Sequence, residues 1–193
     1  MSPRMFVVAG PPGGGKSTVF PVVSFGVSYF NADDRAAELN VSSYAGIPKH
    51  IRKAVNLEFE QFVLGCVERR TSFAIETTLR NTVTLEQAKL ARAAGFQTEM
   101  RYLALGNFAM HVERVKARAD AGGHSASEST LLEIYNASLT NLPKAIHTMD
   151  DLWVYDNSQV GGPPRLLLET EKGEVRFLTE DLPDWLSTAL DVS

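Results

Sequence analysis

The sequence predicts an α/β protein in which a parallel central sheet lies between helical layers, giving three layers in all. Short apolar runs bounded by turn-forming residues alternate with longer segments of helical spacing, a pattern typical of parallel strands joined by crossover helices. The chain has 193 residues, 44% of them apolar and 22% charged, which are ordinary values for one globular domain. We therefore expect a single domain spanning residues 1–193.

Five strands are predicted, each a short apolar run, at residues 5–9, 27–30, 73–75, 98–104 and 152–155. Six helices are expected between them, at residues 16 to about 23, 34–39, 49–70, 84–94, 108–121 and 128–147. Pro21 falls one turn into the first of these helices, where it removes a backbone hydrogen bond and clashes with the preceding turn. We expect that helix to be short or bent.

The pattern changes after Asn157. Residues 161–164 read Gly-Gly-Pro-Pro, and two apolar runs at 165–168 and 175–178 flank the turn formers Lys172 and Gly173, which predicts a β-hairpin. A helix around Trp185 follows. We expect a core of about residues 1–158 and a small C-terminal appendage, hairpin and helix, over about 159–193.

Charge and cysteine content exclude several classes of protein. Nineteen Lys and Arg against twenty-three Asp and Glu give a net charge of −4, which argues against a surface built to coat nucleic acid. The one cysteine, Cys66, excludes an internal disulfide and, lying in an apolar run, is expected in the core. No apolar run is long enough to span a membrane, so we expect a cytoplasmic protein without membrane contact.

A glycine-rich motif gives the sharpest functional signal. Residues 10–17 read Gly-Pro-Pro-Gly-Gly-Gly-Lys-Ser, the pattern of a phosphate-binding P-loop, and they follow a strand and open a helix as that mechanism requires. A glycine-rich turn without a ligand is the alternative. We expect a P-loop NTPase fold that binds ATP and Mg²⁺, with Lys16 on the β- and γ-phosphates and Ser17 on the metal. The nucleotide-binding residues are then Gly10, Pro11, Pro12, Gly13, Gly14, Gly15, Lys16, Ser17 and Thr18.

Polar residues follow the second and third strands, at the strand ends that face the ligand crevice of an open parallel sheet. Asp33 or Asp34 could accept the proton of an attacking hydroxyl, although Asp33 could equally cap the helix that follows. The charged residue Glu76 could bind substrate hydroxyls, a metal-bound water or an arginine partner, whereas the alternative is that Glu76 and Thr78 act as loop caps. Arg80, in the same segment, completes the predicted substrate side.

Arg114 and Arg118 are four residues apart, which places them on one face of the predicted helix. A phosphoryl-transfer enzyme needs a cation to offset the charge that develops on the migrating group. A solvated basic face is the alternative. The residues Gly122, Gly123 and His124 that follow resemble a hinge into a lid. His50, His111 and His147 lack metal-ligand spacing, so we assign no zinc site.

Taken in order, these motifs resemble the zeta-toxin-like family of P-loop kinases, particularly its small stand-alone bacterial members. The resemblance spans about residues 5–158. It is carried by the P-loop, by the run Phe-Asn-Ala-Asp-Asp at 30–34, by Ile-Glu-Thr-Thr at 75–78, by Arg114 and Arg118 with Gly122–His124, and by Val-Tyr-Asp-Asn-Ser at 154–158.

The resemblance implies a fold like that of nucleoside-monophosphate kinases and, in the toxins proper, ATP-dependent phosphorylation of the sugar 3′-hydroxyl of UDP-N-acetylglucosamine. It implies that Asp33 is the general base, that Glu76 and Thr78 contact the sugar, and that Arg114 or Arg118 contacts the γ-phosphate. A small-molecule hydroxyl acceptor and an antitoxin are the implied partners. The chain departs from the family at Glu133–Tyr135, where an arginine pair before the tyrosine is absent, and it lacks a long C-terminal region.

Two other functions fit the same residues. One is a kinase for another nucleoside, a metabolite or a polynucleotide 5′-hydroxyl, since the same loop and base serve all of these. The other is a nucleotide-dependent switch or ATPase without an acceptor, although the chain has no Asn-Lys-x-Asp guanine signature.

Overall fold

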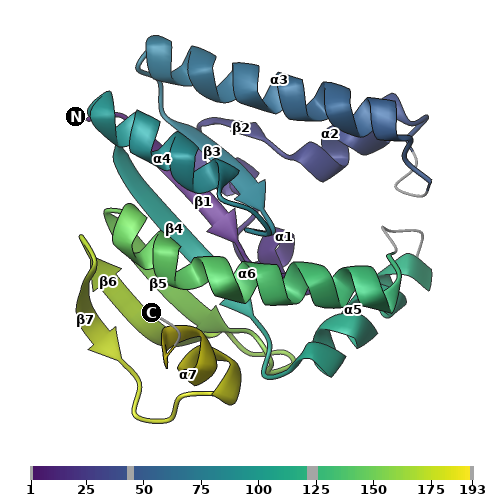
Figure 1. The fold of residues 1–193 in the computed structure, drawn as a ribbon, viewed down its shortest axis with the longest axis vertical. Helices are drawn as coiled ribbons and strands as arrows, with labels where there is room; N and C mark the ends of the chain where they lie inside the picture. The colour runs from purple at the N-terminus through teal and green to yellow at the C-terminus, as the bar shows by residue number, and fades with distance from the viewer. Residues whose placement is uncertain (1, 43–45, 121–125, 192–193) are drawn as a thin grey trace.

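One continuous sheet organises the chain (Figure 1). The computed structural model describes residues 2–42, 46–120 and 126–191, and within these the sheet has seven strands in the order β2-β3-β1-β4-β5-β6-β7. The first five in that order run parallel, and β6 and β7 are antiparallel. The strands are β1 (Arg4–Ala9), β2 (Ser28–Phe30), β3 (Phe73–Thr77), β4 (Gln97–Ala104), β5 (Asp151–Asp156), β6 (Arg165–Glu171) and β7 (Glu174–Leu178). The five predicted parallel strands are confirmed.

Helices connect the strands close to where the periodicity predicts them. They are α1 (Lys16–Val19), the 3-10 helix η1 (Val22–Phe25), α2 (Ala32–Leu39), α3 (Lys49–Glu68), α4 (Val83–Ala93), α5 (Phe108–Asp120), α6 (Glu128–Thr148) and α7 (Asp184–Asp191). Among the described residues, no helix combines the length and apolarity needed to cross a membrane.

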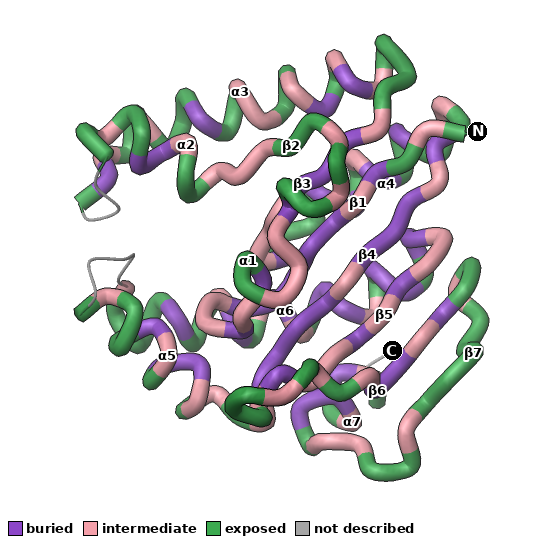
Figure 2. The backbone as a smooth tube through the Cα atoms, turned by 180° about the vertical axis from the view of Figure 1, so that it is seen from behind, coloured by how far each residue is buried: buried purple, intermediate pink, exposed green. Residues whose placement is uncertain are grey.

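The layers on the two faces of the sheet differ in thickness. The main apolar core joins the sheet to α3, α4, α6 and α7, and it includes Cys66 as expected. On the other face a smaller cluster joins α1 and η1 to the sheet, and the view from behind shows no described helix across β5 and β6 (Figure 2). Pro21 explains the thin layer, because its extended backbone ends α1 after one turn. The expected short first helix is confirmed.

The predicted C-terminal hairpin and helix are present, but they are continuous with the sheet and the core and do not form a separate appendage. β6 pairs along β5, so the hairpin extends the central sheet, and Leu167, Leu168, Trp185 and Leu186 are buried in the main core. Lys172 and Gly173 both have positive φ, 51° and 82°, as the tight hairpin turn predicted here requires. The sequence did not predict the pairing of β6 with β5, because the apolar run ends at residue 168 whereas β6 continues through charged residues to Glu171.

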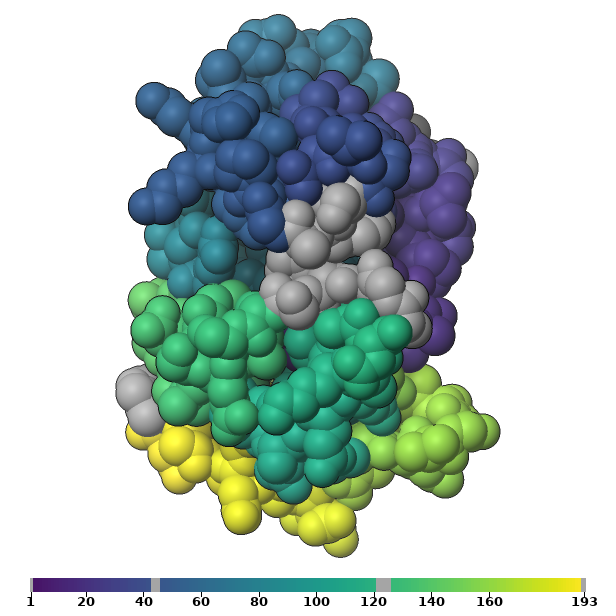
Figure 3. Space-filling model, turned by 90° about the vertical axis from the view of Figure 1, so that its right-hand side faces the viewer, coloured from purple at the N-terminus to yellow at the C-terminus, as the bar shows by residue number. Residues whose placement is uncertain are grey.

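The fold brings the carboxyl ends of β1, β3 and β2 to one edge of the molecule. Figure 3 looks toward this edge, with the α2 and α3 segments above and α5 and α6 below. The loops that follow these strands therefore converge between the α2 and α3 segments and the α5 and α6 segments. Ligands bind at this end of the strands in open parallel sheets.

Candidate active site

The P-loop (residues 10–17) runs from the end of β1 into α1, which is a single turn beginning at Lys16. Gly13 and Gly15 have φ of 78° and 89°, in the left-handed region that favours glycine. A Cβ on Gly13 would lie 2.7 Å from the carbonyl oxygen of His111, and one on Gly15 would lie 2.3 Å from Asn157 Nδ2. A side chain at Gly13 would therefore meet the backbone of α5, and one at Gly15 would displace the Asn157 amide, each at a φ that is strained for residues other than glycine.

Lys16 is buried beneath the loop. Its Nζ donates to the carbonyl oxygens of Gly10 at 2.9 Å and Pro11 at 3.2 Å, and it lies 4.0 Å from Glu76 Oε1. Burial lowers the pKa of the ammonium, the carboxylates of Glu76 and Asp33 oppose that shift, and Arg118 adds to it. The cation thus lies among hydrogen-bond acceptors at the base of the loop.

Ser17 and Glu76 bring two oxygen donors together. Ser17 Oγ donates to Oε2 of Glu76 at 3.0 Å and approaches Oε1 at 3.3 Å. A hydroxyl beside a carboxylate is a donor set that suits Mg²⁺, so these residues fit the expected metal. In the described part of the chain no three His, Cys, Asp or Glu side chains are grouped to hold a metal by themselves, so phosphate and water oxygens would have to complete the coordination.

A cavity of about 290 Å³ joins the P-loop to most of the other predicted residues. The loop residues that line it are Pro12, Gly13, Gly15, Lys16 and Ser17, and the predicted residues outside the loop that line it are Asp33, Glu76, Thr78, Arg80 and Arg118. Side chains of α3 that were not expected in the site also line it, namely Arg52, Asn56, Phe59 and Glu60.

Asp33 is not the cap of α2. That role belongs to Asn31, whose Oδ1 accepts the backbone N–H groups of Asp33 at 3.0 Å and Asp34 at 3.3 Å. The capping alternative for Asp33 is therefore wrong. Its carboxylate lines the cavity from the first turn of the helix.

The loop after β3 is held by a neighbouring threonine. Thr77 Oγ1 accepts the N–H of Leu79 at 3.1 Å, whereas Glu76 accepts from Ser17. Thr78 is half-buried and Arg80 exposed, and both line the cavity. Thr77 therefore caps this loop in place of Glu76, whose carboxylate accepts from Ser17.

The two arginines of α5 lie in different surroundings. Arg118 lines the cavity, whereas Arg114 Nη2 donates to the carbonyl oxygen of Asn157 at 2.8 Å, beside the P-loop. Arg118 is exposed as well as lining the cavity, and Lys116 is exposed and pairs with Glu128 at 3.5 Å. The predicted hinge at Gly122, Gly123 and His124 lies outside the described residues.

The sequence assigned no role in the site to His111 or Asn157, although Asn157 lies in the run at 154–158 that carries the family resemblance. His111 Nε2 accepts the N–H of Leu105 at 3.0 Å, and Nδ1 lies 2.7 Å from the carbonyl oxygen of Pro12. Asn157 Nδ2 donates to the carbonyl oxygen of Gly14 at 3.0 Å. Burial lowers the pKa of His111 to about 4, with Lys16 and Arg114 adding to the shift and the Pro12 carbonyl and Asp156 opposing it. The imidazole is therefore neutral near pH 7.

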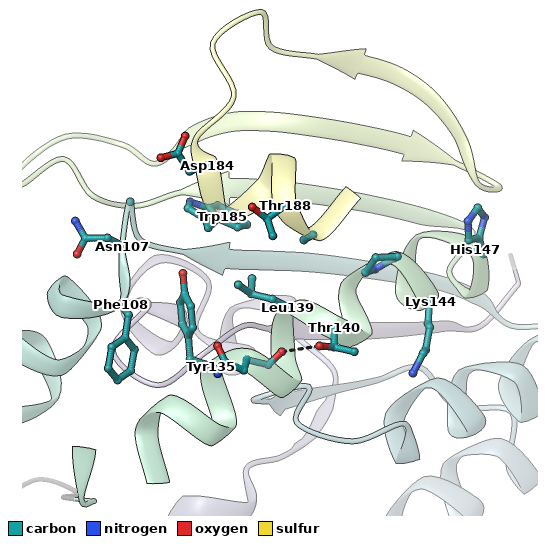
Figure 4. A pocket seen from close by; sticks show the side chains of 14 residues that line it. Asn107, Phe108, Tyr135, Leu139, Thr140, Lys144, His147, Asp184, Trp185 and Thr188 are labelled. Atoms are coloured by element: carbon teal, nitrogen blue, oxygen red, sulfur yellow. Dashed lines mark hydrogen bonds between the residues drawn. The ribbon is translucent and has the colours of Figure 1, made fainter. Parts of the chain in front are cut away.

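A larger cavity, of about 990 Å³, lies between α6 and α7 (Figure 4). Tyr135 and Leu139 of α6 face Trp185 and Thr188 of α7 across it. No P-loop residue lines this cavity. Despite its size, we do not place the chemistry here, because the phosphate loop and the candidate base both line the smaller one.

Comparisons with known sequences give little about this chain. No family model matches it. An uncharacterized protein of Haemophilus influenzae is 27% identical over 62 residues, which cover 32% of this chain and 44% of that protein. The match thus spans less than half the length of this curated relative.

Comparisons with solved structures identify the fold. The PezAT chromosomal toxin–antitoxin system of Streptococcus pneumoniae contains a chain that matches 99% of this one, over 83% of its own length, with a TM-score of 0.65 and 16% identity. The AvrRxo1-ORF1:AvrRxo1-ORF2 complex matches 90% of this chain and 60% of its own, with a TM-score of 0.69 and 15% identity. A putative kinase from Chloroflexus aurantiacus matches 72% of this chain and 79% of its own, with a TM-score of 0.55 and 16% identity.

The fold is that of the P-loop kinases. The resemblance to zeta-toxin-like members that the motifs predicted is confirmed at the level of the fold. Identities of this size carry the fold alone, so the reaction and its substrates have to be argued from the site.

Proposed function

We propose that the protein is an ATP-dependent kinase that transfers the γ-phosphoryl group of Mg-ATP to a hydroxyl of a small acceptor, such as a UDP-N-acetyl sugar. The observation that carries this proposal is the cavity of about 290 Å³ whose walls contain both a phosphate loop and an aspartate. A kinase must hold the donor phosphates and a proton acceptor on either side of one reacting centre.

The donor side is formed by the P-loop. Lys16 donates to two loop carbonyls, and in the proposed complex its ammonium exchanges these bonds for β- and γ-phosphate oxygens. Charge-assisted bonds to phosphate are stronger than bonds to a neutral carbonyl, so the exchange is favourable. Because α1 is a single turn, we assign most of the anion binding to Lys16 and the loop amides.

Ser17 and Glu76 would hold Mg²⁺, the hydroxyl as a direct ligand and the carboxylate through water. The bound metal supplies positive charge that offsets the charge on the transferring group. The hydrogen bond between these two side chains keeps both oxygen donors at the cavity.

Asp33 is the group we assign as the general base. Since Asn31 rather than Asp33 caps α2, the Asp33 carboxylate is available to an acceptor in the cavity. Arg118 is the cation we assign to the transferring phosphoryl group, because it lines the same cavity. Arg114 is held by Asn157, and we assign it to the loop side of the nucleotide.

The acceptor would lie between the segment after β3 and α3. Thr78, Arg80, Arg52 and Asn56 line that side of the cavity and offer hydrogen bonds and positive charge, which suits a polar acceptor carrying phosphate.

We also propose a cytoplasmic location, in keeping with the one free cysteine. Since the PezAT structure is a toxin–antitoxin system, an antitoxin partner is part of the proposal, tested by identifying proteins that co-purify with the tagged chain.

The experiment is to incubate the protein with γ-labelled ATP, Mg²⁺ and a small-molecule extract, and to identify any labelled product by mass spectrometry. The proposal expects a labelled hydroxyl compound that is absent with Lys16→Ala. Labelled inorganic phosphate as the sole product would favour the switch or ATPase. Labelling of a 5′-hydroxyl oligonucleotide, offered in a separate reaction, would favour the other kinase class.

A further inference from the structure

We infer that His111 and Asn157 are positioning residues that turn two backbone N–H groups of the P-loop toward the bound phosphates. The inference rests on the proposed function only in taking the ligand to be a nucleotide phosphate chain. Each side chain donates a hydrogen bond to one backbone carbonyl oxygen of the loop. Each bond thereby orients the N–H group of the residue that follows that carbonyl.

The first of these bonds acts on the peptide between Pro12 and Gly13. Because Leu105 N–H donates to Nε2 of His111 at 3.0 Å, that nitrogen carries no proton, and Nδ1–H must donate to the Pro12 carbonyl oxygen at 2.7 Å. In a trans peptide the C=O and the N–H point in opposite directions. Holding the Pro12 oxygen against α5 therefore points the N–H of Gly13 away from α5.

The second bond acts on the peptide between Gly14 and Gly15. Asn157 Nδ2 donates to the Gly14 oxygen at 3.0 Å in a buried contact, so the N–H of Gly15 points away from the end of β5. Both Gly13 and Gly15 line the cavity that contains Lys16. The two amides are thereby directed to the side where anionic oxygens would bind.

The loop needs such external contacts because of its composition. Three consecutive glycines, Gly13 to Gly15, leave their peptide planes free to rotate at little steric cost. A peptide turned the other way would present a carbonyl oxygen to the phosphates and repel them. The bonds from His111 and Asn157 select the favourable orientation before the ligand arrives, which reduces the ordering cost of binding.

The same contacts tie the loop to the arginine helix. His111 and Arg114 both belong to α5, and Arg114 Nη2 donates to the backbone oxygen of Asn157 at 2.8 Å. The imidazole is buried, with its ring packed 5.3 Å from that of Tyr135. The low pKa of His111 keeps the acceptor on Nε2 free of a proton. Loop, helix and strand end therefore form one rigid support.

Two substitutions of His111 separate orientation from folding. The shorter amide of His111→Asn places a donor near the position of Nδ1 and can keep the bond to Pro12. The longer amide of His111→Gln reaches the position of Nε2 and can keep only the bond to Leu105. Asn157→Asp keeps the shape of the side chain but sets an oxygen against the Gly14 carbonyl. His50→Asn, on the exposed surface of α3, is the matched control.

The main measurement is the dissociation constant for Mg·ADP by calorimetry. The thermal unfolding temperature of each variant and the NMR chemical shifts of the Gly13 and Gly15 amides are measured in parallel. ADP needs no acceptor and is not turned over, so failure of the kinase proposal does not affect this readout. We expect His111→Asn and His50→Asn to bind within about threefold of wild type, and His111→Gln and Asn157→Asp to bind about tenfold more weakly or worse. The Gly13 amide should shift in His111→Gln and the Gly15 amide in Asn157→Asp.

Wild-type affinity in both His111→Gln and Asn157→Asp would overturn the inference. So would losses of affinity that follow the losses of thermal stability across all variants, since a merely structural role predicts that correlation. Wild-type protein that binds neither Mg·ADP nor pyrophosphate would overturn both this inference and the proposed function. Tight binding without phosphoryl transfer to any acceptor would refute the kinase alone, with the variant series still deciding the inference.

Discussion

Ser17 and Glu76 are 59 residues apart in the chain, yet the serine hydroxyl donates to the glutamate carboxylate at 3.0 Å. The sheet explains the contact. Parallel pairing of β1 with β3 sets Val8 opposite Glu76, so the P-loop begins just beyond the point where this carboxylate leaves the sheet. A strand register thus places a hydroxyl and a carboxylate at one end of the cavity.

Glu76→Gln should raise the Mg²⁺ concentration needed for half-maximal activity by about tenfold or more. The amide of glutamine has the shape of the glutamate carboxylate but lacks the negative charge that attracts Mg²⁺. The measurement is a Mg²⁺ titration of phosphoryl transfer at saturating ATP. Glu133→Gln, on the exposed face of α6, is the control. An unchanged Mg²⁺ midpoint in Glu76→Gln would remove this residue from the metal site.

Arg118→Ala and Arg114→Ala should affect different kinetic constants. Arg118 lines the cavity, and its loss should lower kcat by about 10²- to 10³-fold with little change in the KM for ATP. Arg114 holds Asn157, and its loss should mainly raise the KM for ATP and lower the unfolding temperature. Steady-state kinetics of the two variants decide the assignment, and the reverse pattern would exchange the two roles.

Gly15→Ala should weaken nucleotide binding by about 100-fold or more, because the added Cβ would lie 2.3 Å from Asn157 Nδ2 at a φ of 89°. Gly26→Ala is the matched control, since Gly26 also has a positive φ, 66°, but its Cβ would meet nothing within 4 Å. We expect that variant to lose about 1 kcal/mol of stability and to keep its affinity. Equal affinities in the two variants would contradict the close packing of the loop.

The stability of the protein should depend on pH through His111. Its pKa is lowered from 6.5 to about 4 in the folded state, so the unfolded chain takes up a proton first as the pH falls. The contribution of this residue is fully present above pH 6.5 and is lost toward pH 4, by up to about 3 kcal/mol.

Urea unfolding at pH 7.5, 6 and 5 measures this effect in wild type and in His111→Asn. The stability difference between the two should change with pH, because only the wild type loses the contribution of the imidazole. Parallel stability curves would show that His111 does not titrate between the folded and unfolded states as described.

The sequence predicted the features that depend on local pattern. The parallel strands follow from apolar runs, the P-loop from its motif, and the short α1 from Pro21. What the sequence did not reveal depends on distant residues. His111 meets Pro12 across 99 positions and Asn157 meets Gly14 across 143, and neither side chain carries a local signal of its partner. The choice of Asn31 over Asp33 as the cap is a competition between neighbours that spacing does not resolve.

The central claim is that a carboxylate at the cavity accepts a proton from the acceptor hydroxyl while the P-loop holds Mg-ATP. Asp33→Asn and Asp34→Asn test it most directly, because the two residues are adjacent and the Asp33 side chain lines the cavity. The measurement is single-turnover transfer of labelled phosphate to the identified acceptor, with Mg·ATP affinity measured in parallel. We predict that Asp33→Asn lowers the transfer rate by about 100-fold or more at unchanged affinity, and that Asp34→Asn keeps most of the rate. Wild-type transfer by Asp33→Asn would contradict the account.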